Sequence, residues 1–246
     1  MALASKVAVI GGGISGSNLC SALRKLSGDV CEIDLYDKGR ELGGRASTRT
    51  HTHHGAKYVF DHGAQYIGRP QGATFTDAIN DWLDKGYIEV WSSRLRSWSM
   101  AGGMVDVPDD ARYTPTGGFS ALCRSLIAEA RVKARNDVAV RVERTNEHWS
   151  VVNTRTQEVV GTGYDQVVFT DRSSVLAHEH VFTTIEQQMF YRSVRSMQQR
   201  PLLSLMVVFD AKETERLEKT FPHGGCKFID HPVLGWVAKD SSKGGR

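Results

Sequence analysis

Three glycines near the start of the chain, within the run from Gly11 to Gly16, have the types and spacing of a dinucleotide-binding turn. Positions 11, 13 and 16 match the pattern GxGxxG. Gly11 permits a tight turn out of a strand, Gly13 lets the backbone approach a pyrophosphate, and Gly16 lets a helix pack close to that strand. Because helix N-termini attract anions, we expect this turn to bind phosphate, with the hydroxyl of Ser15 as a further donor.

The elements that must position this turn can be predicted from the residues around it. Residues 6–10 form an apolar run typical of a buried parallel strand. In the next segment, apolar residues recur at the spacing of a helix that packs on a sheet, and they are Leu19, Ala22, Leu23 and Leu26. Alternation over residues 31–37 predicts a second strand ending in an acid, Asp37. This acid lies 21 residues after Gly16 (positions 16 and 37), close to the ~20 expected for a carboxylate that binds ribose hydroxyls.

The residues after Asp37 narrow the choice of dinucleotide. Lys38 follows the acid directly, and Gly43, Gly44 and Arg45 come shortly afterwards. A Gly-Gly-Arg in this place resembles the flavoprotein amine oxidase superfamily. The resemblance implies that the glycine pair lets the backbone pass the pyrophosphate of FAD. It also implies that the arginine neutralises phosphate charge, a role suited to its planar guanidinium group.

A third motif, DHGAQYIG at residues 61–68, narrows the resemblance further. Asp-Lys, then Gly-Gly-Arg, then Asp-x-Gly-Ala-Gln-Tyr is the order found in renalase and renalase-like proteins. The resemblance implies that this segment runs beside the flavin and that the backbone near Val138 contacts the adenine. The expected cofactor-binding residues are Gly11, Gly13, Ser15, Gly16, Asp37, Lys38, Gly43, Gly44, Arg45, Gly63, Ala64, Gln65, Tyr66, Ile67, Gly68 and Val138.

The resemblance also implies a fold and an activity. The expected fold class is α/β, a discontinuous Rossmann-type FAD-binding domain with an inserted α+β substrate domain. Residues 1–70 and 116–175 are expected to form the first, and residues 71–115 and 176–246 the second. The implied activity is an oxidation in which an amine or a reduced nicotinamide nucleotide passes a hydride to FAD, and oxygen then yields hydrogen peroxide. Because the cofactor carries this chemistry, no catalytic residue is predicted.

Two other functions stay open. An NAD(P)-binding reductase would use the same strand, turn and helix, but has no need for the motifs after Asp37. A non-enzymatic nucleotide-binding protein is the second alternative. It is suggested by residues 239–246, which do not resemble the segment with which such flavoproteins close over the flavin. We expect the sequence to be a truncated form that lacks this closing segment.

Composition excludes some functions and compartments. The 246 residues carry a net charge of +3, too small and scattered to indicate a nucleic acid or a membrane as partner. No apolar run reaches the ~20 residues of a membrane span, and residues 1–6 leave no room for a signal peptide. The cysteines, Cys20, Cys31, Cys123 and Cys226, form no CxxC pair. We expect buried thiols in a cytoplasmic protein.

Two further groups of residues have types that could form a site. His51, His53 and His54 suggest a metal site, but no Asp, Glu or Cys stands nearby to complete a ligand set. We therefore expect an exposed turn or hairpin and no metal. Trp91 and Trp98 could line a substrate pocket, although most such aromatic residues pack in a core.

The remaining pattern predicts the other elements. Helices are expected around 75–83 and 119–127, an exposed charged helix over 212–219, and irregular strands and turns over 87–107. Residues 138–142 and 149–152 predict an antiparallel pair, and residues 166–169 a buried strand. The apolar run 202–209 is expected to be a strand.

Overall fold

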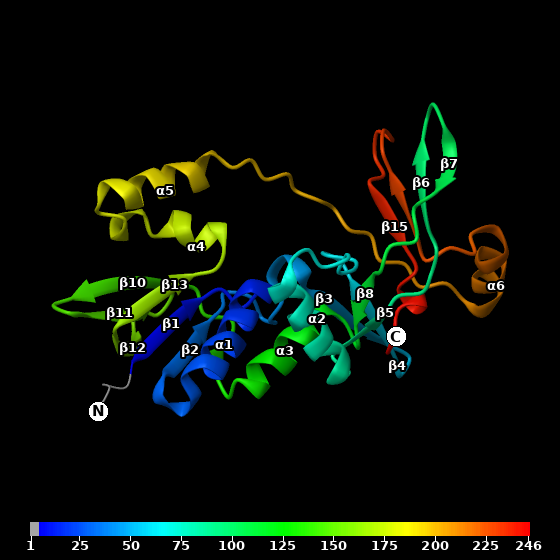
Figure 1. Ribbon diagram of the computed structural model, residues 1–246. Helices are drawn as coiled ribbons and strands as arrows, with labels where there is room; N and C mark the ends of the chain where they lie inside the picture. The colour runs from blue at the N-terminus through cyan, green and yellow to red at the C-terminus, as the bar shows by residue number, and fades with distance from the viewer. Residues whose placement is uncertain (1–4) are drawn as a thin grey trace. The chain divides into compact units, whose positions relative to one another are not determined.

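The computed structural model describes residues 5–246, which divide into two compact units (Figure 1). The first unit contains the residues up to 47 together with residues 123–203. The second contains residues 48–122 and 204–246. The chain therefore crosses between the units more than once, as expected of a discontinuous domain.

The borders of these units differ from the predicted domain borders. Residues 48–70 and 116–122 belong to the second unit and residues 176–203 to the first. The predicted assignment of cofactor and substrate roles to the two sets of segments stays a prediction. The expectation of no signal peptide depends on residues 1–4, which lie outside the described residues.

The first unit is built on a parallel sheet with the strand order β13-β1-β2-β9. The strands are β1 (Lys6–Ile10), β2 (Glu32–Tyr36), β9 (Lys133–Arg135) and β13 (Gln166–Phe169). Val7 and Val9 of β1 pack against α1 (Ile14–Ser27) and α3 (Phe119–Glu129). Ala8 and Ile10 belong to a second apolar cluster on the opposite face of the sheet. Both faces are covered, which confirms the predicted buried strand and explains its continuous apolar sequence.

Helix α1 packs on this sheet through small residues. Its buried residues are Gly16, Ser17, Cys20 and Ser21. Leu19 and Leu23 pack against the core from its edge, but Ala22 is exposed and Leu26 is 87% exposed. The helix is confirmed, but its predicted contact face is wrong at these two positions. Small side chains let the helix axis approach the sheet closely, and this contact turns the leucine stripe partly toward solvent.

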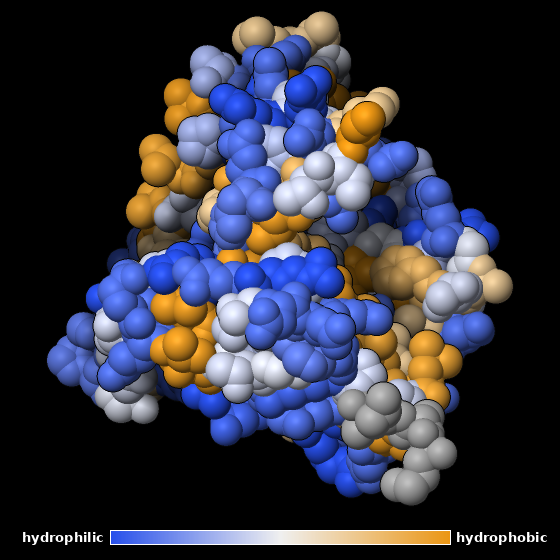
Figure 2. All heavy atoms as spheres, turned by 90° about the vertical axis from the view of Figure 1, so that its left-hand side faces the viewer, coloured by the Kyte–Doolittle hydropathy of each residue, from blue (hydrophilic) through white to orange (hydrophobic). Residues whose placement is uncertain are grey.

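An antiparallel sheet covers the other face of the parallel sheet. It comprises β10 (Val140–Thr145), β11 (His148–Asn153) and β12 (Val159–Tyr164), in that order, and confirms the predicted pair. Val142 and Val151 point into the core, while Glu143 and Arg144 are exposed. Figure 2 views the molecule from the side at which β10 and β11 lie in Figure 1, and hydrophilic residues cover most of the surface seen there. One solvated face is usual for an antiparallel sheet.

A buried hydrogen-bond chain joins the two sheets. The Tyr164 hydroxyl donates to Asp34 Oδ2 at 2.5 Å and accepts from the Tyr36 hydroxyl at 2.6 Å. Burial raises the pKa of both tyrosines, so both hydroxyls remain donors. The chain therefore satisfies a carboxylate that is only 7% exposed.

Two helices, α4 (Arg172–Ala177) and α5 (Ile185–Ser196), follow β13 in the first unit. Asp171 caps α4 by accepting from the Ser174 N–H group, and Thr184 forms a capping box with Gln187 at the start of α5. The helices meet through a small apolar cluster made of Val175, Tyr191 and Val194.

The second unit contains a hairpin, two small sheets and two helices of its own. The hairpin strands are β3 (Thr48–His53) and β4 (Ala56–Asp61). One sheet pairs β5 (Ile88–Val90) with β8 (Tyr113–Pro115). The other has the order β15-β14-β6-β7 and consists of β6 (Leu95–Ser99), β7 (Gly103–Asp106), β14 (Gly225–Phe228) and β15 (Trp236–Ala238). The helices are α2 (Ala73–Asp84) and α6 (Ala211–Thr220); α3 begins here, and its residues from Cys123 onward belong to the first unit.

The predicted strand over residues 202–209 is wrong. In residues 5–246, none of the strand pairings includes this segment. Leu203 is fully exposed and Leu205 is 90% exposed. The apolar sequence indicated a strand, but a strand also needs a neighbour with which to form hydrogen bonds.

All four cysteines are free and buried, as predicted. Burial raises the pKa of Cys20 to about 12 and that of Cys123 to about 11, so both are thiols. Within residues 5–246, no helix is both long enough and apolar enough to cross a membrane.

Candidate dinucleotide-binding site

The glycine turn lies at the carboxyl edge of the parallel sheet, between β1 and α1. Gly11 has φ +111°, a conformation that favours glycine, and its N–H group donates to the Tyr36 carbonyl at 2.8 Å. A β-carbon on Gly16 would lie 1.9 Å from the Gly11 carbonyl oxygen. Both glycines are therefore required by the geometry of the turn, in the roles predicted for them.

The N-terminus of α1 offers donors to an anion. Gly13 precedes the helix and gives it no side-chain cap, and no acidic residue stands in its first turn. The first N–H groups of a helix have no partner within the helix, and the helix dipole makes this end positive. A β-carbon on Gly13 would lie 3.5 Å from its nearest neighbour, the Gly43 carbonyl oxygen, so a methyl group there would make an ordinary van der Waals contact without a clash. Ser15 is exposed beside it.

Asp37 stands beside this turn at the end of β2. Its carboxylate accepts hydrogen bonds from the N–H groups of Gly12 and Gly39, and the residue is 9% exposed. A carboxylate has about four acceptor positions, so two remain for a pair of ribose hydroxyls. Val138 donates its N–H to the Asp37 carbonyl at 2.9 Å. The structure thus brings the expected adenine contact next to the expected ribose acid.

The Gly-Gly-Arg segment lies directly against the glycine turn. The Gly43 N–H group donates to the Gly12 carbonyl at 2.9 Å, and Gly13 and Gly43 form a short parallel bridge. Gly43 and Gly44 both have positive φ, at +126° and +55°. The chain therefore turns sharply here, and it leaves Arg45 exposed in a turn of 3-10 helix.

Arg45 borders an open depression of about 330 Å³. Its other walls come from the end of β13 and from the helices that follow, and they are Phe169, Thr170, Asp171, Arg172, Val175, Phe190, Val194, Met197, Gln198 and Gln199. The depression lies next to Gly11, because a β-carbon on Gly11 would be 2.5 Å from Thr170 Oγ1. A cationic group and apolar walls beside the glycine turn suit a dinucleotide.

Asp171 and Thr170 are residues of this edge that the sequence pattern did not single out. Burial tends to raise the pKa of Asp171, but hydrogen bonds from Ser173 and Ser174 outweigh it and lower the pKa below its usual value. Lys38 donates to the Ser173 hydroxyl at 2.9 Å and so lies at the same edge. Polar residues directly after a buried parallel strand could have been recognised by the rule that identified Asp37, since carboxyl ends of parallel strands share one edge.

The expected flavin contacts at residues 63–68 belong to the second unit. Ile67 and Tyr113 exchange two backbone hydrogen bonds, at 2.8 and 2.9 Å. The Tyr66 ring packs against those of Trp91 and Trp236, with centroids 5.8 and 6.0 Å away. Gln65 turns its side chain back to the main chain, where its amide nitrogen donates to the carbonyl groups of Asp61 and Gly63.

The two tryptophans and the histidines that the sequence singled out have contacts that a structural role explains. Trp91 is 4% exposed and its indole N–H donates to Ser242, so it packs in the second unit. The Trp98 ring packs against that of Phe228 in a tilted arrangement, with the ring centroids 5.7 Å apart. The histidines lie on the exposed β3–β4 hairpin, as predicted, and residues 5–246 contain no cluster of three or more His, Cys, Asp or Glu suited to a metal ion.

Comparison with known proteins agrees with this geometry. A family model described as an NAD(P)-binding Rossmann-like domain matches residues 9–82, whereas no curated protein matches the chain. A solved structure of a putative protoporphyrinogen oxidase from Exiguobacterium sp. 255-15 is similar, with a TM-score of 0.62 and 9% identity over 98% of this chain and 74% of that one.

Two further solved structures are similar over less of their own length. A putrescine oxidase redesigned in its cofactor binding gives a TM-score of 0.54 and 13% identity, over 76% of this chain and 63% of that one. A tetracycline destructase gives a TM-score of 0.46 and 16% identity, over 70% of this chain and 39% of that one. This chain therefore spans less than two thirds of the length of these two proteins. It has a mixed α/β fold with a Rossmann-like nucleotide-binding domain, similar in fold to the two oxidases.

Proposed function

We propose that the chain binds FAD and is an oxidoreductase of the amine oxidase and renalase-like group. One observation carries this proposal, the hydrogen bond from Gly43 to Gly12. It holds the Gly-Gly-Arg segment against the phosphate-binding turn, so that Arg45 reaches the same edge of the sheet as the N-terminus of α1. The guanidinium group of Arg45 would give a pyrophosphate a second, charged contact in addition to the N–H groups of the helix.

The residues at this edge would bind and orient the cofactor. Asp37 would accept the ribose hydroxyls, the N-terminus of α1 and Arg45 would bind the pyrophosphate, and the backbone near Val138 would contact the adenine. Residues 63–68 are proposed as flavin contacts. When bound, FAD supplies the redox chemistry, since it takes a hydride equivalent from a substrate and passes two electrons to oxygen.

The proposed substrate is a small amine or a reduced nicotinamide nucleotide. An amine that loses a hydride equivalent and a proton would become an imine. A reduced nicotinamide that loses a hydride would become the oxidised nicotinamide ring. Oxygen would take two electrons and two protons to become hydrogen peroxide. Similarity in fold to a putrescine oxidase and a putative protoporphyrinogen oxidase supports an oxidation of this kind. The proposed location is the cytoplasm.

A second candidate is an NAD(P)-binding reductase. It is favoured by the description of the family model that matches residues 9–82. The same turn, helix and acid would bind NAD(P), but a nicotinamide dinucleotide has no specific need for the turn that Gly43 and Gly44 make toward Arg45. A third candidate, a nucleotide-binding protein without activity, would bind a dinucleotide and oxidise nothing.

The test is a titration of the purified protein with FAD, NADH and NADPH, repeated with Arg45→Ala. Arg40→Ala is the matched control, because Arg40 is an exposed arginine in the same loop. We expect FAD to bind most tightly and Arg45→Ala to weaken it by roughly tenfold, about 1.4 kcal/mol. Arg40→Ala should leave the affinity unchanged.

Tighter binding of NADPH or NADH than of FAD would overturn the proposal in favour of the reductase. If FAD binds but neither amines nor reduced nicotinamides reduce it, the protein is the inactive nucleotide-binding relative. Hydrogen peroxide formed in proportion to substrate consumed would support the oxidase.

A further inference from the structure

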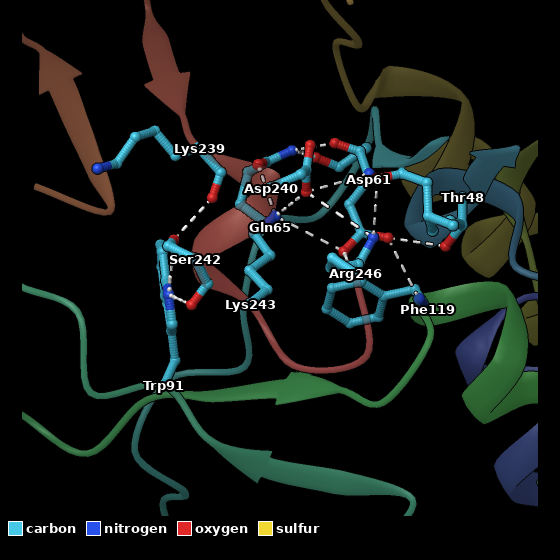
Figure 3. Close-up of polar contacts among 12 residues, drawn as sticks. Thr48, Asp61, Gln65, Trp91, Phe119, Lys239, Asp240, Ser242, Lys243 and Arg246 are labelled. Carbon is cyan, nitrogen blue, oxygen red and sulfur yellow. Dashed lines mark hydrogen bonds and ion pairs between the residues drawn. The ribbon is translucent and has the colours of Figure 1, made fainter. Parts of the chain in front are cut away.

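A buried cluster of charged residues lies beside the 63–68 segment in the second unit (Figure 3). It consists of Asp61, Asp240, Lys243 and Arg246, and we call it the Asp61 cluster. Lys243 Nζ lies 2.7 Å from Asp240 Oδ1 and 3.6 Å from Asp61 Oδ2, and Arg246 pairs with Asp61. The side chains of Asp61 and Lys243 are completely buried and that of Arg246 is 2% exposed.

The cluster is balanced in charge and firmly anchored. Two carboxylates face two cations, so it needs no further ion. Asp61 Oδ1 also accepts from the Thr48 hydroxyl at 2.7 Å and from the Phe119 N–H group at 3.3 Å. The carboxylate is thereby tied to the start of β3 and to the first turn of α3. A buried ion pair adds little net stability, but removing one partner leaves the other charge buried and unpaired.

Gln65 connects this cluster to the segment expected to contact the flavin. Its amide oxygen accepts a hydrogen bond from Lys243 Nζ at 3.1 Å. Its amide nitrogen donates to the carbonyl oxygens of Asp61 and Gly63. Both ends of the amide are therefore engaged within the protein, which fixes the turn from Asp61 to Gln65 from the inside. In Figure 3, Lys243 and Gln65 approach one another from separate parts of the chain.

Without Lys243, this turn would lose a charged anchor for the Gln65 side chain. The amide oxygen of the half-buried Gln65 would lose its donor, which favours a change of side-chain rotamer. Such a change would break the hydrogen bonds from Gln65 to the carbonyl groups of Asp61 and Gly63. The backbone that leads to Tyr66 would then be less firmly fixed. The effect of Lys243 on the segment therefore passes through the Gln65 side chain.

We propose that Lys243 is a positioning residue that holds Gln65, and through it the Gly63–Gly68 backbone, in the conformation that accepts the flavin. The inference rests on the proposed function, because the role of this segment as a flavin contact is part of it. The Gln65 side chain holds the backbone in place through its hydrogen bonds, and any contact with the cofactor is made by the backbone around it.

The experiment compares Lys243→Met, Gln65→Leu and the double variant with the wild type. Lys239→Met is the matched control. Lys239 comes from the same segment and its 11% exposed side chain is paired with Glu218 at 2.6 Å. The readouts are amide hydrogen exchange of residues 63–68 without added FAD, the affinity for FAD, and the temperature of unfolding.

We expect Lys243→Met and Gln65→Leu each to speed exchange in residues 63–68, and each to weaken FAD binding by roughly tenfold. The double variant should be no worse than the more severe single variant, because both changes break one connection. Lys239→Met should lower the unfolding temperature without changing either of the other readouts. Gln65→Leu leaves the ion pairs intact and so tests the connection even if Lys243→Met does not fold.

Wild-type exchange rates in Lys243→Met, or additive effects in the double variant, would overturn the inference. It is equally overturned if Lys239→Met reproduces both effects, because a general loss of stability would then explain them. A wild-type protein that binds no FAD would overturn the proposed function instead. In that case, the exchange rates of residues 63–68 alone decide whether Lys243 fixes this segment.

Discussion

Gly43 donates its backbone N–H to the carbonyl oxygen of Gly12 over 2.9 Å. This bond joins two glycine-rich segments that are distant in sequence. One segment supplies the helix N-terminus and the other supplies Arg45, so both groups proposed to bind phosphate lie at one edge of the sheet. Asp37 completes the arrangement by accepting from the Gly12 N–H group. The candidate site is therefore held together largely by backbone hydrogen bonds, which explains its need for glycine.

Two glycines of the turn should respond differently to alanine. In Gly16→Ala the new methyl group would lie 1.9 Å from the Gly11 carbonyl oxygen, so the helix must move. We expect a loss of roughly 1–3 kcal/mol in the free energy of unfolding. In Gly13→Ala the nearest atom is 3.5 Å away and the backbone has φ −73°, which alanine tolerates.

Gly13→Ala should therefore keep the stability of the wild type and weaken FAD binding, because its methyl group enters the space proposed for the pyrophosphate. Urea unfolding and FAD titration of both variants measure the difference. A Gly13→Ala protein that binds FAD as the wild type does would show that the pyrophosphate lies elsewhere.

The hydrogen-bond chain between the sheets should contribute strongly to stability. Tyr164→Phe removes the donor to the buried carboxylate of Asp34 and also the acceptor for Tyr36. Leaving a buried polar group without its partner costs about 1–3 kcal/mol. We expect a corresponding drop in the free energy of unfolding measured in urea. Tyr58→Phe, at a half-buried tyrosine on the β3–β4 hairpin, is the control. Equal urea midpoints for the two variants would contradict this account.

His178 should make the stability of the first unit depend on pH. It is 1% exposed, its Nδ1 donates to the Ser174 carbonyl at 2.6 Å, and its ring packs on Phe169. Burial lowers the pKa of His178 below its usual 6.5, and neighbouring His180 lowers it further. Below pH 6.5 the unfolded chain binds a proton that the folded chain refuses, so stability falls as the pH falls toward the folded pKa.

The measurement is the free energy of unfolding of wild type and His178→Phe at pH values on either side of 6.5. The wild type should lose more stability than the variant on going to the acidic side. Parallel pH profiles would show that His178 does not produce the dependence.

The turn and the elements around it could be predicted because their chemistry is local. Gly11, Gly16 and Asp37 belong to one strand-turn-helix-strand unit, in which spacing alone fixes the geometry. The antiparallel pair at β10 and β11 was predictable for the same reason, since alternation and a short turn lie in one stretch of sequence.

Features that depend on distant residues were not predictable. Asp61 and Arg246 form their pair across a separation of 185 residues, and nothing near either residue indicates the other. The segment 202–209 has the composition of a strand, but composition does not reveal whether a pairing strand is present. The sequence pattern assigns the buried face of α1 to its most hydrophobic residues, and leucine is more hydrophobic than serine. Leu26 was therefore predicted to be buried. The close contact at Gly16 gives the buried face to small residues instead.

The visible absorption spectrum of the purified protein, taken before and after acid release of any cofactor, tests the central claim most directly. We predict a flavin spectrum, and the released compound should be intact FAD. A colourless protein that also fails to take up added FAD would contradict the account.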